Sequence, residues 1–181
     1  AASGDTSTLR HGFFSGDDFH RTHDPKMNKI TVRDLVIDGK NRLWIISHED
    51  GVFILHKEST QRLTVQNGLA DDQIWSFLED TDGNIWMGSM SGITKFGKKP
   101  FELYDSDSGL PGKDILSVFA AKTGEIWGGT YKGPFVINPG RNLLIYENAP
   151  GIPSDAPTVF EITSDQAGST WLGTYYGITL F

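Results

Sequence analysis

The side chains that could do chemistry in this sequence lie in a few short clusters. The segment Asp80-Thr81-Asp82-Gly83-Asn84 gathers oxygen ligands in the manner of a calcium loop. A true calcium loop spreads its ligands over a longer segment and closes with a bidentate glutamate. The related segments 121–125 and 165–169 retain the glycine but not the set of acids. We therefore predict a hairpin turn at each of these segments, and no calcium site.

Three histidines, His11, His20 and His23, lie near the N-terminus. No fixed set of three or four metal ligands accompanies them, and His20 and His23 would point to opposite faces of a strand. The adjacent carboxylates at 17–18 and at 71–72 diverge, so they make poor acid–base pairs. No Gly-x-Ser-x-Gly nucleophile segment occurs. We assign no catalytic residue, no metal and no cofactor.

Composition excludes several further kinds of chemistry and partner. The 181 residues carry 16 basic and 23 acidic side chains, a formal charge of −7, which argues against nucleic acid or an anionic membrane as the main partner. Cysteine is absent, so disulfides and thiolate chemistry are excluded. No apolar run approaches the roughly 18 residues that a membrane span needs. The N-terminal residues lack signal-peptide features, as a processed N-terminus also would, so secretion stays open.

The tryptophans reveal an internal repeat. Four of them are spaced by 42, 41 and 44 residues, and each follows a glycine-containing turn. A second glycine follows each tryptophan by six or seven positions. A third marker, such as Asn67-Gly68-Leu69, precedes the tryptophan by 18 to 20 residues in three copies. The first copy aligns Asp38-Gly39 with Asp82-Gly83, which predicts a turn two residues longer there. The four tryptophans are Trp44, Trp86, Trp127 and Trp171, and the second glycines are Gly51, Gly92, Gly133 and Gly177.

Each copy predicts four short strands. The first is an apolar stretch, the second carries the tryptophan, the third begins at the second glycine, and the fourth precedes the next copy. Four antiparallel strands in about 42 residues are typical of a β-propeller blade, so we predict an all-β propeller or a segment of a larger one. The expected units are an N-terminal strand region and linker (1–28) and blades at 29–66, 67–107, 108–148 and 149–181. The last blade would lack its own final strand.

Packing between blades explains why the same residue types recur at fixed positions of the repeat. A large flat indole on the second strand can fill the space between neighbouring sheets. Gly88, Gly129 and Gly173, two residues beyond the tryptophan, permit close approach of the next sheet. Ile46 holds this place in the first copy, so that blade should pack differently.

The segment 19–24 resembles an isolated fourth strand. It either completes the last blade and closes a four-bladed ring, or it belongs to a preceding blade of a larger propeller, with residues 9–14 as a further third strand. Incomplete blades leave strand edges open, so a homodimer through such edges is one possible assembly.

With these motifs in view, the sequence resembles the two-component regulator propeller repeats of periplasmic sensor regions in bacterial hybrid two-component systems. The matching residues are Asn67-Gly68-Leu69, Ile74 to Asp80, and Asp82 to Ser89 with Gly92, and the pattern recurs around the last two tryptophans. The resemblance covers residues 19–181. It implies a propeller that usually has more blades, output through other domains of a receptor, and in many relatives a response to carbohydrates.

The loops between the second and third strands are the best candidates for a ligand site. In a propeller these tips surround the central funnel, and aromatic rings with polar atoms suit a sugar or another polar ligand. Alternatively, the tyrosines simply pack the rim or a neighbouring domain. The candidate ligand-binding residues are His48, Tyr131, Lys132, Tyr175 and Tyr176.

These features predict a non-catalytic, ligand-sensing module that is periplasmic or extracellular and does not insert into the membrane. Its partners would be a small molecule or glycan and the remaining domains of a larger receptor. Two alternatives remain open. A lyase-like propeller enzyme would gather His48 with acids from other blades around the funnel, whereas a structural or protein-interaction propeller would show a flat aromatic rim.

Overall fold

The computed structural model describes residues 12–15, 18–21, 30–57, 59–97, 101–140, 142–146, 151–152, 154 and 157–181. Within these ranges the regular structure consists of β-strands and one short 3-10 helix, η2 (Val65–Asn67). No helix in the described residues is long and apolar enough to cross a membrane.

The strands form a series of small antiparallel sheets in chain order, which confirms the predicted all-β blade fold. Besides a two-stranded N-terminal sheet, the described residues form four blade sheets, numbered here from the first blade: three with four strands each and a fourth with three. The first sheet contains β3 (Val32–Ile37), β4 (Leu43–Ser47), β5 (Val52–His56) and β6 (Ser59–Leu63); the second contains β7 (Ile74–Glu79), β8 (Ile85–Ser89), β9 (Gly92–Phe96) and β10 (Glu102–Tyr104). The third contains β11 (Ile115–Ala120), β12 (Ile126–Thr130), β13 (Gly133–Ile137) and β14 (Leu143–Ile145); the fourth contains β15 (Val159–Ser164), β16 (Thr170–Thr174) and β17 (Gly177–Leu180).

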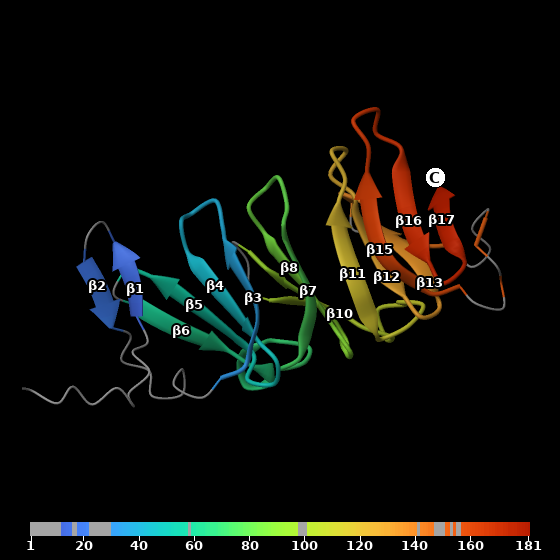
Figure 1. Cartoon of the computed structure of the whole chain (residues 1–181). Helices are drawn as coiled ribbons and strands as arrows, with labels where there is room; N and C mark the ends of the chain where they lie inside the picture. Colours follow the sequence, from blue (N-terminus) through green and yellow to red (C-terminus); the bar gives the residue numbers. More distant parts are fainter. Residues whose placement is uncertain are drawn as a thin grey trace, which may run out of the picture.

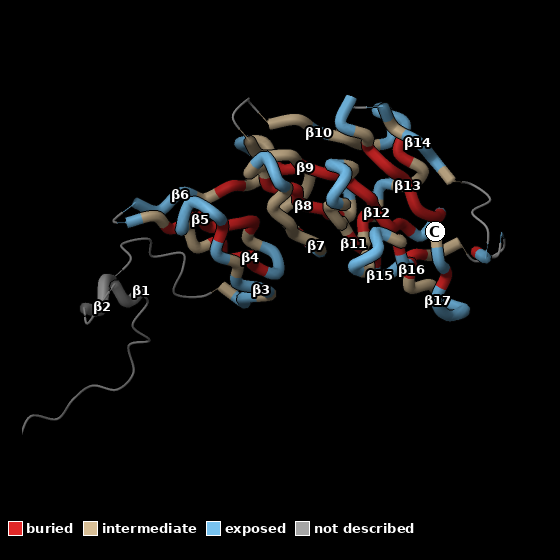
Figure 2. Tube along the Cα trace, turned by 90° about the horizontal axis from the view of Figure 1, so that it is seen from above, coloured by how far each residue is buried: buried red, intermediate tan, exposed pale blue. Residues whose placement is uncertain are grey.

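The four sheets stand side by side as an open fan (Figure 1). Seen from above, the first strands β3, β7, β11 and β15 follow one side of the row, and the last strands β6, β10 and β14 follow the other (Figure 2). β11 packs directly on both β7 and β15, as successive inner strands of a propeller do. The buried residues run through the middle strands, between the sheets.

The N-terminal strands β1 (Gly12–Ser15) and β2 (Asp18–Arg21) pair with each other. β2 overlaps the segment predicted as an isolated fourth strand, and β1 overlaps the further third strand. Because β2 pairs with β1 rather than with β17, this strand does not close a four-bladed ring. His11 and His23, and the side chain of His20, lie outside the described residues.

The repeated indole fills the junction between successive sheets, as predicted. The Trp44 ring contacts Phe77 and Phe96 of the second sheet, with ring centroids 5.3 and 5.4 Å apart. Trp86 packs in one core with Ile115 and Ile126 of the third sheet. Trp127 contacts Phe181 of the fourth sheet at 5.6 Å. All three indoles are buried, whereas the Trp171 indole, with no described sheet beyond it, is 37% exposed.

The glycine on the second strand sets how closely the sheets approach. A Cβ added at Gly129 would lie 2.5 Å from the carbonyl oxygen of Val159, and one added at Gly88 would lie 2.6 Å from Ile115. In the first sheet Ile46 takes this place, and a cavity of about 180 Å³ lies beside it. The first junction therefore packs differently, as Ile46 predicted. The cavity is lined by Arg33, Asp34, Ile46, Ile74, Trp75, Ser76 and Phe77.

The turn before the tryptophan corrects one prediction. Asp38 N–H donates to the carbonyl of Arg42, and Asn41 N–H donates to the carbonyl of Asp38. Asp80, Gly83 and Asn84 form the same pair of bonds. Asp38 therefore corresponds to Asp80, and the first turn is not two residues longer. The left-handed position that Gly83 fills in the second copy (φ 75°) is taken by Asn41 (φ 57°), a residue that tolerates this conformation.

Candidate functional site

The loop tips between the second and third strands share one hydrogen-bonded design. The last residue of the second strand is a serine or threonine, and its hydroxyl donates to the carbonyl of the following left-handed glycine. Thr130 Oγ1 lies 2.8 Å from the Gly133 oxygen and accepts a hydrogen bond from Lys132 N–H. Ser47, Ser89 and Thr174 bond their glycines in the same way. A hydrogen bond from the end of the second strand to the glycine therefore closes each tip.

The structure exposes the predicted site residues but brings only some of them together. Tyr131, Tyr175 and Tyr176 are 49%, 73% and 64% exposed. The Tyr175 ring lies 5.9 Å from that of Tyr176 and 6.3 Å from that of Phe160 on β15, so these three rings form one aromatic cluster. Tyr131 is tied to the fourth sheet through its carbonyl, which accepts from the Thr158 hydroxyl at 3.4 Å. Sequence reasoning missed Phe160, whose place in an apolar strand suggested a core residue.

His48 and Lys132 belong to other tips. Lys132 is exposed beside Tyr131. His48 Nδ1 lies 3.8 Å from Glu49 of its own tip. Within the described ranges, no group of three or more His, Cys, Asp or Glu side chains is placed to hold a metal ion. The gathering of His48 with acids from other sheets, which a lyase-like site would require, is thus not seen among the described residues.

The turns at the opposite ends of the strands hold a carboxylate that sequence reasoning missed. The indole N–H of Trp44, Trp86 and Trp171 donates to the aspartate six residues earlier, at 2.8, 2.7 and 3.2 Å. The recurrence of aspartate at this spacing in three copies was the available signal, and it was hidden by aligning Asp38 with Asp82. Asp80 also accepts from the backbone N–H groups of Asp82 and Asn84, which confirms a hairpin turn.

These bonds shift the ionisation of the turn aspartates. Burial raises the pKa of Asp38, but hydrogen bonds from Arg42 and Trp44 outweigh it and leave that pKa below its ordinary value. Burial likewise raises the pKa of Asp80, and the bonds from Trp86 and Asn84 lower it further than burial raises it. The Trp171 indole and the Ser169 N–H lower the pKa of Asp165. The turns of the first, second and fourth copies thus each hold an ionised carboxylate against an indole.

The third copy lacks this carboxylate. Ala121 occupies the aspartate position, and the buried Nε1 of Trp127 has no hydrogen-bond acceptor among the described residues. The Trp127 ring instead stacks on Tyr146, with centroids 5.7 Å apart and planes 3° from parallel.

Small antiparallel sheets repeated in chain order, with an indole wedge at each junction, define a β-propeller blade array. Residues 68–91 match the model of the two component regulator propeller family. The second copy is therefore a repeat of this kind, which confirms the resemblance seen in the sequence. No curated protein matches the chain.

The fold is shared with solved structures, of which three are described here. The extracellular domain of a protein described as a hybrid two component system from B. thetaiotaomicron has a TM-score of 0.74 at 20% identity, over 94% of this chain and 24% of that one. Virginiamycin B lyase from Staphylococcus aureus has a TM-score of 0.62 at 17% identity, over 91% of this chain and 58% of that one. PorZ is described as a surface component of the type-IX secretion system of Porphyromonas gingivalis. It has a TM-score of 0.63 at 16% identity, over 91% of this chain and 28% of that one. The chain thus spans less than two thirds of each of these three structures.

Proposed function

We propose that this chain is a non-catalytic, ligand-sensing propeller segment of a bacterial signalling receptor, located in the periplasm or outside the cell. The match of residues 68–91 to the two component regulator propeller carries the proposal. The likeness to an extracellular domain described as part of a hybrid two component system supports it. The chain would act together with further domains of a larger receptor, and a second copy could join at an open strand edge.

The ligand would bind at the loop tips, on the residues predicted from the sequence. Tyr175 and Tyr176 offer exposed ring faces beside Phe160, and Tyr131 with Lys132 adds a ring and a hydrogen-bond donor on the neighbouring sheet. Flat rings that carry polar atoms suit a carbohydrate, whose C–H faces pack on aromatic rings while its hydroxyls bond to polar groups. His48 would contribute from the first sheet.

Binding would act on signalling by changing the balance between arrangements of the receptor. A ligand that contacts tips on two sheets stabilises the arrangement in which both contacts are made, and it shifts the population toward that arrangement. Tips that are closed by hydrogen bonds favour this role, since less of the binding free energy is then lost in ordering the loops.

A glycan-binding screen of the full chain tests the proposal. We expect neutral glycans to bind, and the double substitution Tyr175→Ala with Tyr176→Ala to weaken the best ligand roughly tenfold, as loss of about 1.4 kcal/mol of contact would give. Leu144→Ala serves as the matched control, because Leu144 is also an exposed large side chain but lies on β14. If no glycan binds, or if both variants weaken binding equally, the tip site is wrong.

A further inference from the structure

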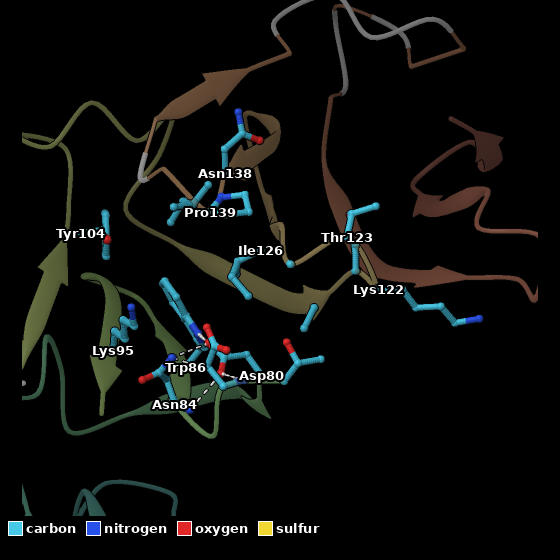
Figure 3. A pocket seen from close by; sticks show the side chains of 16 residues that line it. Asp80, Asn84, Trp86, Lys95, Tyr104, Lys122, Thr123, Ile126, Asn138 and Pro139 are labelled. Carbon is cyan, nitrogen blue, oxygen red and sulfur yellow. Dashed lines mark hydrogen bonds between the residues drawn. The ribbon is translucent and has the colours of Figure 1, made fainter. Parts of the chain in front are cut away.

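A cavity of about 270 Å³ lies between the second and third sheets, at the opposite ends of the strands from the tips (Figure 3). It is bounded by the turn 80–84 of the second sheet, the turn 121–124 of the third sheet, and Asn138 and Pro139 after β13. Neither the tip residues nor the Phe160 cluster lines it. It is therefore separate from the site of the proposed function.

Small side chains at two repeated positions account for the cavity. At the first junction Glu79, the last residue of β7, accepts a hydrogen bond from Gly39 N–H at 2.7 Å, and Phe96, the last residue of β9, packs on Trp44. Phe181 packs on Trp127 in the same manner at the third junction. At the second junction the corresponding residues are Ala120 and Ile137, which both line the cavity. The first junction has large side chains at both positions, and the third has one, Phe181, so the blade fold does not require the space found at the second junction.

The walls of the cavity offer both hydrogen-bond donors and acceptors around an apolar floor. Trp86 and Ile126 form the floor, with Asp80 and Asn84 grouped beside the indole (Figure 3). Asp80 is held in place by bonds from Trp86 and from the Asn84 side chain at 2.7 and 2.9 Å. The Lys95 ammonium lies 5.0 Å from the Trp86 ring centroid.

The formal charges of the lining side chains cancel. The lining includes two carboxylates, Asp80 and Asp82, and two ammonium groups, Lys95 and Lys122, and the Lys122 side chain points away from Asp80 (Figure 3). An anion would meet a Lys95 ammonium that is already 3.7 Å from Glu102. A cation would meet an Asp80 carboxylate that already accepts from Trp86, Asn84 and Asp82. Either ion would therefore lose its hydration with little compensation.

The Asn138 amide can donate and accept. The Asn84 amide nitrogen already donates to Asp80, and the Thr123 hydroxyl donates to Glu125, so these two side chains offer acceptor oxygens to a ligand hydroxyl.

We propose that this cavity binds a single neutral polyol no larger than a monosaccharide. Pockets for drug-sized ligands begin at about 300 Å³, so this cavity suits one small molecule. The hydroxyls would bond to the amides and carboxylates of the wall, and the C–H face of the molecule would lie on Trp86.

Titration of the full chain with glucose, galactose, xylose and myo-inositol tests the proposal. The readout is the ¹H–¹⁵N resonance of the Trp86 indole, identified by its loss in Trp86→Phe, because this N–H lies at the cavity floor. We expect at least one of the four to shift this resonance saturably. The charged relatives glucuronate and glucosamine should bind roughly tenfold more weakly or worse.

Two variants test whether the molecule binds inside this cavity. Ala120→Glu and Ile137→Phe each introduce the residue that fills the first junction, and each should weaken binding roughly tenfold or more. Ser164→Glu is the matched control, because Ser164 ends β15 as Ala120 ends β11, and it should leave binding unchanged. An unshifted Trp86 resonance with all four probes overturns the proposal. Unchanged binding in a folded filled variant overturns it as well. Neither result bears on the tip site, which Tyr175→Ala and Tyr176→Ala test separately.

Discussion

The bond between a turn aspartate and the indole six residues later fixes the turn in the first, second and fourth copies, and the third copy is a natural variant without it. We predict that Ala121→Asp raises the free energy of unfolding by about 1 kcal/mol at neutral pH, because the Trp127 N–H gains an acceptor. Urea unfolding followed by tryptophan fluorescence measures the change. The reciprocal variant Asp80→Ala should lower stability by about 1–3 kcal/mol, since it leaves the Trp86 N–H unpaired.

The gain from Ala121→Asp should depend on pH. The native turn aspartates have lowered pKa values in the folded state, so their stabilising effect is present above the unfolded pKa, near 3.9. It is lost as the pH falls through the lower, folded pKa. The gain should therefore vanish in acid. Ala121→Asn is the control, because its amide oxygen accepts but does not titrate. An Asp gain that persists in acid would mean that the carboxylate does not bond the indole.

At this scale the sequence predicted the role of the indole but not that of its partner. The tryptophans stand out by size and spacing, and their wedge position follows from area burial. The aspartate of the first copy was misaligned because Asp38-Gly39 consists of the same two residue types as Asp82-Gly83. In the structure, the left-handed position of the first turn is occupied by Asn41 and not by Gly39. A backbone conformation of this kind is not visible in residue identity.

At the scale of the elements, the close approach of the next sheet depends on one glycine each in the second and third blades, Gly88 and Gly129. We predict that Gly129→Ala lowers stability by about 1–3 kcal/mol, because the new Cβ would meet the Val159 carbonyl, which is backbone and cannot turn away. At Gly173, which has no described sheet beyond it, the nearest atom to an added Cβ is 3.5 Å away. Gly173→Ala should therefore be close to neutral. Thermal unfolding compares the two, and equal losses would contradict the packing role.

The order of the blade strands was predictable, since most of them are apolar runs between turn residues. The N-terminal segments 9–14 and 19–24 were placed up to three residues from β1 and β2. The aromatic cluster at the fourth tip was predicted in part, because loop position indicates exposure but not which strand residue joins the cluster. The cavity of the second junction was not predictable. It depends on the sizes of Ala120 and Ile137, which lie on two different strands and look ordinary in sequence.

At the scale of the whole molecule, the fourth sheet presents an apolar face to solvent. Trp171 is paired with Leu180, and Gly173 with Ile178, so these side chains share one face. Ile178 and Leu180 are 76% and 54% exposed, whereas Val136, which pairs with Trp127 as Leu180 does with Trp171, is buried. A contiguous patch of this kind is a surface for association.

We predict that Ile178→Lys with Leu180→Lys lowers binding of the dye ANS and leaves the melting temperature almost unchanged, because no buried contact is lost. Val136→Lys should instead unfold the chain, since it buries a charge without a partner. ANS fluorescence and circular dichroism measure the two effects. Unchanged dye binding in the double variant would place the accessible apolar surface elsewhere.

Each of the four blade sheets carries its indole on one face, and the second, third and fourth receive the preceding indole on the other face, which gives the array two different ends. Two copies that met through the same face would set indole against indole and leave both receiving faces unused. A two-fold symmetric pair is therefore disfavoured at this surface, and any addition here is heterologous. Units then accumulate in one direction, and the rotation between them decides whether the series closes on itself or continues as a spiral.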